Sequence, residues 1–141
     1  MLLTKECDYA IRIVRALSSG TKKTIEQITD GEKIPQKYAY KVIKKLVQAG
    51  FVYSTRGRVG GYHLVKPLDG FSMHDIVNAV DAERYISDCV KPGAKCSFVG
   101  DGEGKCSVHT ELLRIQAVVA AELSQKTMAE ILNLKDDAKA I

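Results

Sequence analysis

PQKYAYKVIKKLVQAGFVYSTRGRVGGYHLV, which spans residues 35–65, has the pattern of an amphipathic helix followed by a β-hairpin. Pro35 suits the first turn of a helix, and Gly50 is a typical terminator after a helix that runs to about Ala49. At about 100° per residue, the apolar side chains of this helix share one side: Ala39, Val42, Ile43 and Leu46. The opposite side is basic and carries one aromatic ring: Lys37, Tyr40, Lys41 and Lys44. Such a helix backs onto a core and presents its basic face to the major groove of DNA.

Two short extended runs, residues 51–55 and 62–65, flank the segment RGRVGG at residues 56–61. Strand, glycine-rich turn and strand predict a hairpin, which Pro67 closes. Glycine permits close backbone approach, and the two arginines at the tip favour the negative potential of a narrow minor groove. A loop that cradles nucleotide phosphates would lead from a strand into a helix, whereas this loop returns into a strand. A nucleotide site is therefore not expected here.

Two further helices precede this unit. Thr4 is a candidate N-cap, and apolar residues at helical spacing follow it until about residues 18–20. Thr24, with Gln27 three residues later, has the pattern of a capping box, and the helix that it opens should end around residues 30–31. Three helices followed by a basic hairpin predict a winged helix-turn-helix. The fold class expected is mainly α with a small β-hairpin wing, joined to a long dimerisation helix.

The charge distribution indicates a polyanion as the partner of residues 1–67. They hold 13 Lys/Arg and 5 Asp/Glu, a balance of +8, whereas residues 68–141 have a balance of −4. We therefore predict that residues 1–67 form the winged helix-turn-helix domain and bind a double-stranded DNA operator. Lys44 is expected on a phosphate, and the two arginines of the hairpin in the minor groove. The full set of expected DNA contacts is Gln36, Lys37, Tyr40, Lys41, Lys44, Arg56, Arg58, Gly60, Gly61 and Tyr62.

The C-terminal half divides into three further segments. Residues 68–105 begin with a short helix that Ser72 caps, and a stretch rich in Gly, Lys and Asp without apolar periodicity follows. Residues 106–134 are expected to form a dimerisation helix and a short C-terminal helix. Residues 135–141 are expected to be a frayed tail.

The long helix, from Cys106 to about Ser124, is apolar around most of its circumference. Its polar stripe is narrow: Glu111, Arg114, Glu122 and Gln125. A helix this apolar needs burial on more than one side, and we predict a homodimer in which a second copy covers the side that the domain leaves open. Thr127 and Glu130 have the pattern of a capping box that opens the short helix through Leu134.

Three cysteines and a histidine form the pattern C-x₆-C-x₉-C-x₂-H, at Cys89, Cys96, Cys106 and His109. Clustered cysteines in a reducing compartment more often bind metal or do redox chemistry than form structural disulfides. The spacing differs from the close pairs of zinc fingers and from the C-x₂-C-x₂-C run of bacterial ferredoxins. From the spacing alone, an iron–sulfur cluster, zinc and a thiol switch stay open. Cys7, on the first helix, is interpreted as a small buried hydrophobe.

The remaining features narrow the class of protein. The start, Met1-Leu2-Leu3 followed at once by Thr4, lacks the apolar stretch of a signal peptide, and the apolar run of residues 117–121 is too short to span a membrane. We therefore expect a cytoplasmic protein without a membrane partner. Apart from the cysteine group, no acid–base or nucleophile–base constellation is evident in the sequence, so an enzyme is not expected.

The assembled features resemble a family of winged-helix regulators that includes the iron–sulfur assembly repressor IscR and the nitric-oxide-sensing repressor NsrR. The resemblance covers about residues 1–134. It rests on LTKECDYA at residues 3–10, on the helix of residues 34–46 and, most specifically, on the wing RGRVGGYHL at residues 56–64. The pattern of three cysteines and a histidine matches the cluster-binding members.

The resemblance implies a homodimeric transcription factor, with an iron–sulfur cluster of the 2Fe–2S or 4Fe–4S type bound by the three cysteines. The fourth ligand that it implies is His109, as in the assembly regulator, or Asp8, as in the nitric-oxide sensor, where the partner subunit lends the carboxylate. The gaps between the cysteines are longer than is usual in the family, and Cys7 beside Asp8 is a further departure that offers an extra ligand.

The expected function is a repressor whose DNA affinity changes when a signal oxidises, nitrosylates or removes the cluster. Two rival functions stay open at this point. One is a DNA regulator that binds zinc or is switched by thiol oxidation. The other is a small iron–sulfur electron carrier, which would leave the basic helix and the wing without a purpose.

Overall fold

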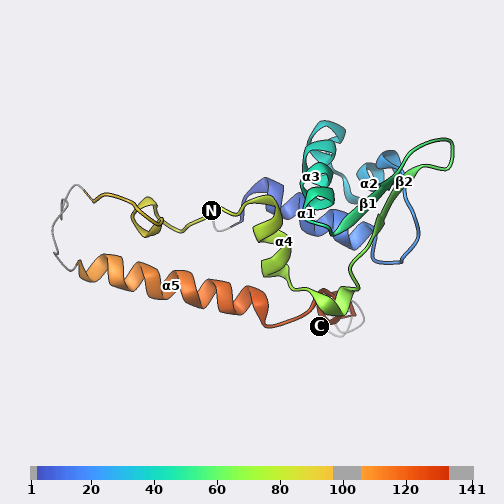
Figure 1. The fold of residues 1–141 in the computed structure, drawn as a ribbon. Helices are drawn as coiled ribbons and strands as arrows, with labels where there is room; N and C mark the ends of the chain where they lie inside the picture. The colour runs from blue at the N-terminus through green and yellow to red at the C-terminus, as the bar shows by residue number, and fades with distance from the viewer. Residues whose placement is uncertain (1–2, 97–105, 134–141) are drawn as a thin grey trace.

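The computed structural model describes residues 3–96 and 106–133, which form a helical head with a β-hairpin and a long helix that extends away from it (Figure 1). Its helices and strands are, in chain order, α1 (Lys5–Ala16), α2 (Ile25–Glu32), α3 (Gln36–Gln48), β1 (Val52–Thr55), β2 (Gly61–Leu64), α4 (Met73–Val80), α5 (Ser107–Ser124) and α6 (Met128–Asn133). Two 3-10 helices lie between them: η1 (Leu68–Gly70) and η2 (Asp88–Val90). This architecture confirms the expected fold class. The expected tail, the end of the cysteine-bearing loop and the last residue of the expected C-terminal helix lie outside the described residues.

Side-chain caps begin the helices where the sequence predicts them. The Thr4 side chain accepts a backbone N–H in the first turn of α1. Thr24 and Gln27 form a reciprocal capping box, in which the Thr24 N–H donates to Gln27 Oε1 at 2.9 Å. Ser72 and Asp75 make the same reciprocal pair at the start of α4. Each cap satisfies N–H groups that a helix start otherwise leaves unpaired, so local sequence accounts for these boundaries.

The end of α2 differs from the prediction, which placed it around residues 30–31. Gly31 stays helical, and the helix closes instead on Lys33, which has a left-handed φ of 56°. The closure carries the chain into the turn that buries Ile34 to 4% exposure. Burying an isoleucine contributes about 1.5–3 kcal/mol. A left-handed non-glycine residue costs about 1–2 kcal/mol, so burial offsets the strain.

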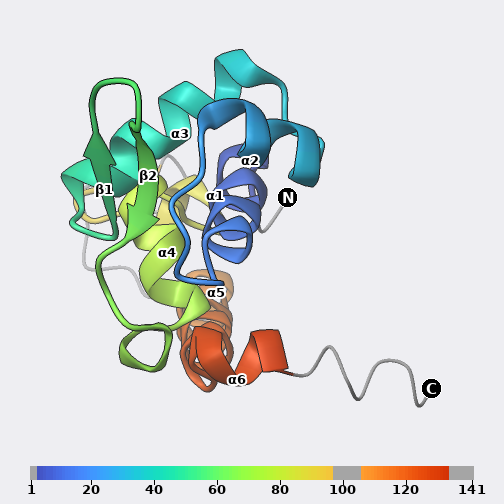
Figure 2. The ribbon, with the colours of Figure 1, turned by 90° about the vertical axis from the view of Figure 1, so that its right-hand side faces the viewer.

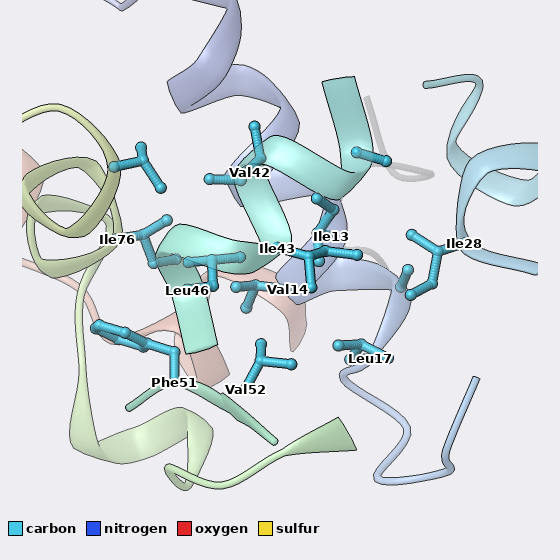
Figure 3. Close-up of a cluster of buried hydrophobic side chains, with 14 of the residues drawn as sticks. Ile13, Val14, Leu17, Ile28, Val42, Ile43, Leu46, Phe51, Val52 and Ile76 are labelled. Carbon is cyan, nitrogen blue, oxygen red and sulfur yellow. The ribbon is translucent and has the colours of Figure 1, made fainter. Parts of the chain in front are cut away.

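The core of the head lies where α1, α2, α3 and α4 meet (Figure 3). Its largest fully buried side chains come from all four helices: Ile13, Leu17, Ile28, Ile43, Leu46 and Ile76. Phe51 and Phe71 extend the core toward the hairpin, with ring planes at 82° and centroids 5.0 Å apart. Cys7 is fully buried, and its Sγ accepts a hydrogen bond from Thr4 at 3.3 Å, which confirms its interpretation as a small buried residue.

The segment that precedes α2 holds the hairpin of β1 and β2 at the end of β2 nearest the turn. The Lys23 N–H donates to the Tyr62 carbonyl at 3.0 Å, and the Tyr62 N–H donates to the Lys23 carbonyl at 2.8 Å. A Cβ on Gly61 would lie 2.8 Å from the Lys23 oxygen, and Gly61 has a φ of 154°. Only glycine allows this close approach, which fixes the wing beside α2 and α3 (Figure 2).

The C-terminal helices attach to the head through α6 and through one side of α5. The Met128 N–H donates to the Phe71 carbonyl at 2.9 Å, and the Met128 side chain is fully buried. α5 approaches this point from the far end of the molecule and packs along one side on α4 (Figures 1 and 2). None of its residues is buried. Among the described helices, none is long and apolar enough to cross a membrane.

Candidate nucleic-acid interface and cysteine segment

α3 separates its two faces as the sequence predicts. Its apolar side chains are buried in the head: Ala39, Val42, Ile43 and Leu46. The expected DNA-contacting side chains of α3 are all exposed: Gln36, Lys37, Tyr40, Lys41 and Lys44. Half of Tyr40 is exposed, with a relative accessibility of 50%. The helix therefore offers a basic face with one aromatic ring, on the side of the head away from α5 (Figures 1 and 2).

The lysines of this face differ in their partners. Lys41 is bound by Glu6, a first-turn residue of α1, and the second oxygen of the same carboxylate binds Lys45. Hydrogen bonds from Lys41 and then from Lys45 lower the pKa of Glu6. Within residues 3–96 and 106–133, Lys37 and Lys44 form no ion pair. The sequence analysis missed this pairing, because 35 residues separate Glu6 from Lys41 and no local pattern connects them.

The tip of the wing exposes Arg56 and Arg58 on a tight turn. The turn is closed by the Gly60 N–H, which donates to the Gly57 carbonyl at 2.9 Å. A Cβ on Gly60 would lie 2.5 Å from the carbonyl oxygen of Thr55, so the turn leaves no room for a side chain. The predicted loop thus returns into a strand and presents two guanidinium groups to solvent.

Two residues expected to contact DNA hold the wing in place. Gly61 lies against the Lys23 carbonyl, and Tyr62 is half-buried against the core. Burial raises the pKa of the Tyr62 hydroxyl, and the nearby Tyr40 and Glu26 raise it further. These contacts give Gly61 and Tyr62 a supporting position where β2 leaves the turn of the wing.

The cysteines lie on the segment that leads from α4 to α5. Cys89 is in η2. Cys89 and Cys96 both line an open hollow of about 570 Å³. Cys106 is the N-cap of α5, and His109 lies in its first turn. All three cysteines are free and half-buried. Among the described residues, no three His, Cys, Asp or Glu side chains converge closely enough to hold a metal ion.

The cysteine segment is anchored although its sequence lacks apolar periodicity. Val90 is 7% exposed, and the Ile86 N–H donates to Gln116 Oε1 in the middle of α5 at 2.9 Å. Asp8, the alternative fourth ligand, lies on α1, where its carboxylate pairs with Arg12 at 3.0 Å. The anchors were not predicted, because a single valine and a glutamine carry no periodic signal.

One side of α5 is occupied and the other is open. A half-buried row at helical spacing faces α4 and η2: His109, Leu112, Gln116, Val119 and Leu123. Large apolar side chains remain exposed elsewhere on the helix: Val108, Leu113, Ile115 and Val118. These side chains spread over more than half of the helix circumference, and exposed apolar side chains of this size mark an interaction site.

A three-helix core with an exposed basic helix and an arginine-tipped hairpin defines a winged helix-turn-helix DNA-binding protein. The chain belongs to the Rrf2 family, described as "Iron-dependent Transcriptional regulator", whose sequence profile matches residues 3–134. It is therefore a transcriptional regulator, and this membership confirms the resemblance found in the sequence.

Two curated relatives are similar to this chain in sequence. The HTH-type transcriptional regulator NsrR of Bacillus subtilis (strain 168) is 26% identical over 140 residues, 97% of this chain and 94% of that protein. Protein aau3 of Rhizobium meliloti (strain 1021) is 27% identical over 95 residues, 66% of this chain and 62% of that protein.

Two solved structures share the fold. IscR of T. potens superposes with a TM-score of 0.76 at 18% identity, covering 98% of this chain and 90% of that one. The oxidized form of CymR of Staphylococcus aureus gives a TM-score of 0.70 at 19% identity, covering 94% and 96%. Identities this low establish the common fold alone.

Proposed function

We propose that the protein is a homodimeric repressor that binds a double-stranded DNA operator and whose DNA affinity depends on an iron–sulfur cluster bound by Cys89, Cys96 and Cys106. The observation that carries the proposal is the position of the three free thiols. They lie on a segment anchored to α5, the helix whose other face is open to a partner. A change at the cysteines can therefore reach the contact between subunits.

The DNA contacts follow from the exposed face of the head. Lys37 and Tyr40 enter the major groove with Gln36 at the start of α3, and Lys44 contacts a phosphate. Arg56 and Arg58 reach an adjacent minor groove from the wing tip. Lys41 shares the face and is bound to Glu6 in the free protein. We propose that the protein is located in the cytoplasm, because its operator would be on the chromosome.

The dimer buries the open face of α5 against a second copy. Val118 and Leu113, which are 46% and 45% exposed, lie on the part of the helix that α4 and η2 leave uncovered, about 140° apart around its axis. A two-fold axis along α5 would present two heads to two half-sites of a palindromic operator. The proposed distance between half-sites is one or more helical turns of DNA.

The donor set fits an iron–sulfur cluster. Three thiolates and one imidazole are soft ligands of the type that iron–sulfur proteins use, and Cys89 and Cys96 already line one hollow. Cys106 and His109 share one turn at the start of α5. His109 is available as fourth ligand, whereas Asp8 would have to leave its ion pair with Arg12. When bound, a cluster of the 2Fe–2S or 4Fe–4S type supplies a centre sensitive to oxidation or nitrosylation.

The chain's own residues transmit the change. For Cys89 and Cys96 to bind the same cluster as Cys106 and His109, residues 89–96 must approach the start of α5. The hydrogen bond from Ile86 to Gln116 fixes the other end of this segment. Cluster binding, by ordering residues 89–96, would favour one of two relative arrangements of the heads. DNA affinity changes if DNA binds one of these arrangements better than the other.

Anaerobic purification followed by iron, sulfide and zinc analysis and a visible spectrum tests the cluster. Cys96→Ala should abolish the visible absorbance, while the matched control Cys7→Ala, at a fully buried position away from the cysteine segment, should retain it. Unchanged absorbance and iron content in Cys96→Ala would contradict the cluster assignment.

A second candidate function is a DNA regulator that binds zinc or is switched by thiol oxidation. It is favoured by the same three half-buried free thiols, which stand on a fold also seen in an oxidized form of CymR. Zinc in place of iron, or DNA affinity governed by a reversible disulfide, would support it. Absence of DNA binding by both the apo and the metal-bound protein would instead favour an electron carrier.

A further inference from the structure

We propose that Glu6 withholds Lys41 from DNA phosphates and so limits sequence-independent binding by the recognition helix. The inference rests on the proposed DNA-binding function and assigns a role to a residue on α1, outside the helix and the wing that contact DNA.

The contacts around Glu6 occupy its whole carboxylate. Lys41 binds Oε1 and Lys45 binds Oε2, and these two lysines lie one turn apart on α3. Lys45 also donates to the Val80 carbonyl at 2.8 Å, which ties α1, α3 and α4 together at this point. The Glu6 side chain is only 24% exposed, so the acidic group is held by its surroundings.

The two lysines differ in what they can do. Lys45 has a second acceptor and is half-buried, so its position is structural. Lys41 is 59% exposed and has Glu6 as its single ion-pair partner among the described residues. The carboxylate raises the pKa of Lys41 and keeps the ammonium group charged while satisfying it. To reach a phosphate, Lys41 must give up a charge-assisted hydrogen bond.

The ion pair between Glu6 and Lys41 lowers mainly the affinity for arbitrary DNA sequences. Contacts between ammonium groups and phosphates supply almost all of the affinity for arbitrary DNA, whereas an operator is also read through base edges. Holding one ammonium group back removes one phosphate contact from both complexes. It also places a carboxylate beside the DNA-facing side of α3. Weak binding to arbitrary DNA is thereby reduced, and release from non-operator sites becomes easier.

Glu6→Gln separates this role from a structural one. The amide keeps the size of the side chain and one oxygen that accepts from Lys45, but it removes the charge that holds Lys41. A purely structural Glu6 would change the melting temperature and leave the salt dependence of DNA binding unaltered.

The experiment measures binding of the intact protein to a non-operator duplex by fluorescence anisotropy between 50 and 200 mM salt. In Glu6→Gln, the slope of log affinity against log salt should steepen by about 0.9, the value for one added phosphate contact. The variant should accordingly lose about 3- to 4-fold more affinity than the wild type across this range.

Three further variants make the test specific. Lys41→Gln in the wild-type background should leave the slope unchanged, and Lys41→Gln added to Glu6→Gln should restore the wild-type slope. Asp69→Asn is the matched control, because it removes one exposed carboxylate in η1, on the side of the head away from α3. It changes the net charge equally and should leave the slope unchanged.

A lower slope in Lys41→Gln alone would overturn the proposal, and this variant decides the matter even if Glu6→Gln fails to fold. A slope of Glu6→Gln equal to that of Asp69→Asn would also overturn it. If the wild type binds no DNA, the proposed function fails and takes this inference with it. Normal wild-type binding with an unaltered Glu6→Gln slope refutes this inference alone.

Discussion

Gly60→Ala tests whether the shape of the wing tip controls DNA binding. The added Cβ would lie 2.5 Å from the Thr55 carbonyl oxygen and 2.8 Å from that of Gly57. Ordinary carbon–oxygen contacts are about 3.3–3.6 Å, so both backbone atoms must move by roughly 0.5–1 Å. The movement strains or breaks the turn hydrogen bond from Gly60 to Gly57. We expect a cost of about 1–3 kcal/mol, as for other overpacked sites.

Gly31→Ala is the matched control, because it adds the same methyl group in open space. A Cβ at Gly31 meets no atom within 4 Å, and the residue is helical near the end of α2. Alanine is favoured over glycine in a helix by up to about 1 kcal/mol. The two substitutions are therefore expected to change the free energy of unfolding in opposite directions.

The assay combines thermal unfolding with anisotropy titrations against salt. Gly31→Ala should raise the melting temperature by about 2–4 °C and leave DNA binding unchanged. Gly60→Ala displaces Arg56 and Arg58, so its salt slope should fall by up to about 1.8, the value for two cationic groups removed from the DNA. A Gly60→Ala variant with the wild-type slope and melting temperature would refute the argument that the tight turn positions the arginines.

Three further predictions address the dimer face, a cap and the acid stability. Val118→Glu places a charge on the open side of α5 and should convert dimer to monomer in sedimentation velocity, because each subunit loses about 1.5–3 kcal/mol of apolar burial. A dimer that persists in this variant would show that Val118 does not lie in the interface. Thr24→Ala removes half of the capping box with Gln27 and should lower the free energy of unfolding in urea by about 1 kcal/mol; an unchanged midpoint would show that the cap is dispensable. A hydrogen bond from the Ser72 N–H lowers the pKa of Asp75, so the ionised carboxylate stabilises the fold at neutral pH, and this contribution is lost as pH falls below about 4. The difference in melting temperature between the wild type and Asp75→Asn should therefore shrink from pH 7 to pH 3. A constant difference would contradict this prediction.

The predictions that the structure confirms depend on residues close in sequence. The capping box of Thr24 and Gln27 spans three residues, and the two faces of α3 follow from a period of 3.6. The return of the wing loop into a strand was readable from its glycines and the flanking extended runs. Each of these patterns carries its own physical reason within one helix or one hairpin, so no knowledge of the tertiary fold is needed.

The features that sequence reasoning missed all join distant segments. Lys23 pairs with Tyr62, Ile86 with Gln116, and Glu6 with two lysines of α3. No local pattern marks Glu6 as different from any other acidic residue in a first helical turn. Likewise, a left-handed Lys33 is favoured only because the chain must turn there to bury the residue that follows.

Periodicity, capping patterns and charge were enough to define a winged-helix DNA binder with a cysteine segment, because helices, turns and net charge arise from neighbouring residues. Packing decided the rest. It joined α4 to the core of the head, left part of α5 open and, among the described residues, brought no three potential metal ligands together. It also placed the Glu6 carboxylate beside Lys41, so that a lysine assigned by its helical face to DNA has an acidic competitor within its own chain. This contact forms only when α1 and α3 pack in one core, because Glu6 and Lys41 are 35 residues apart in the sequence.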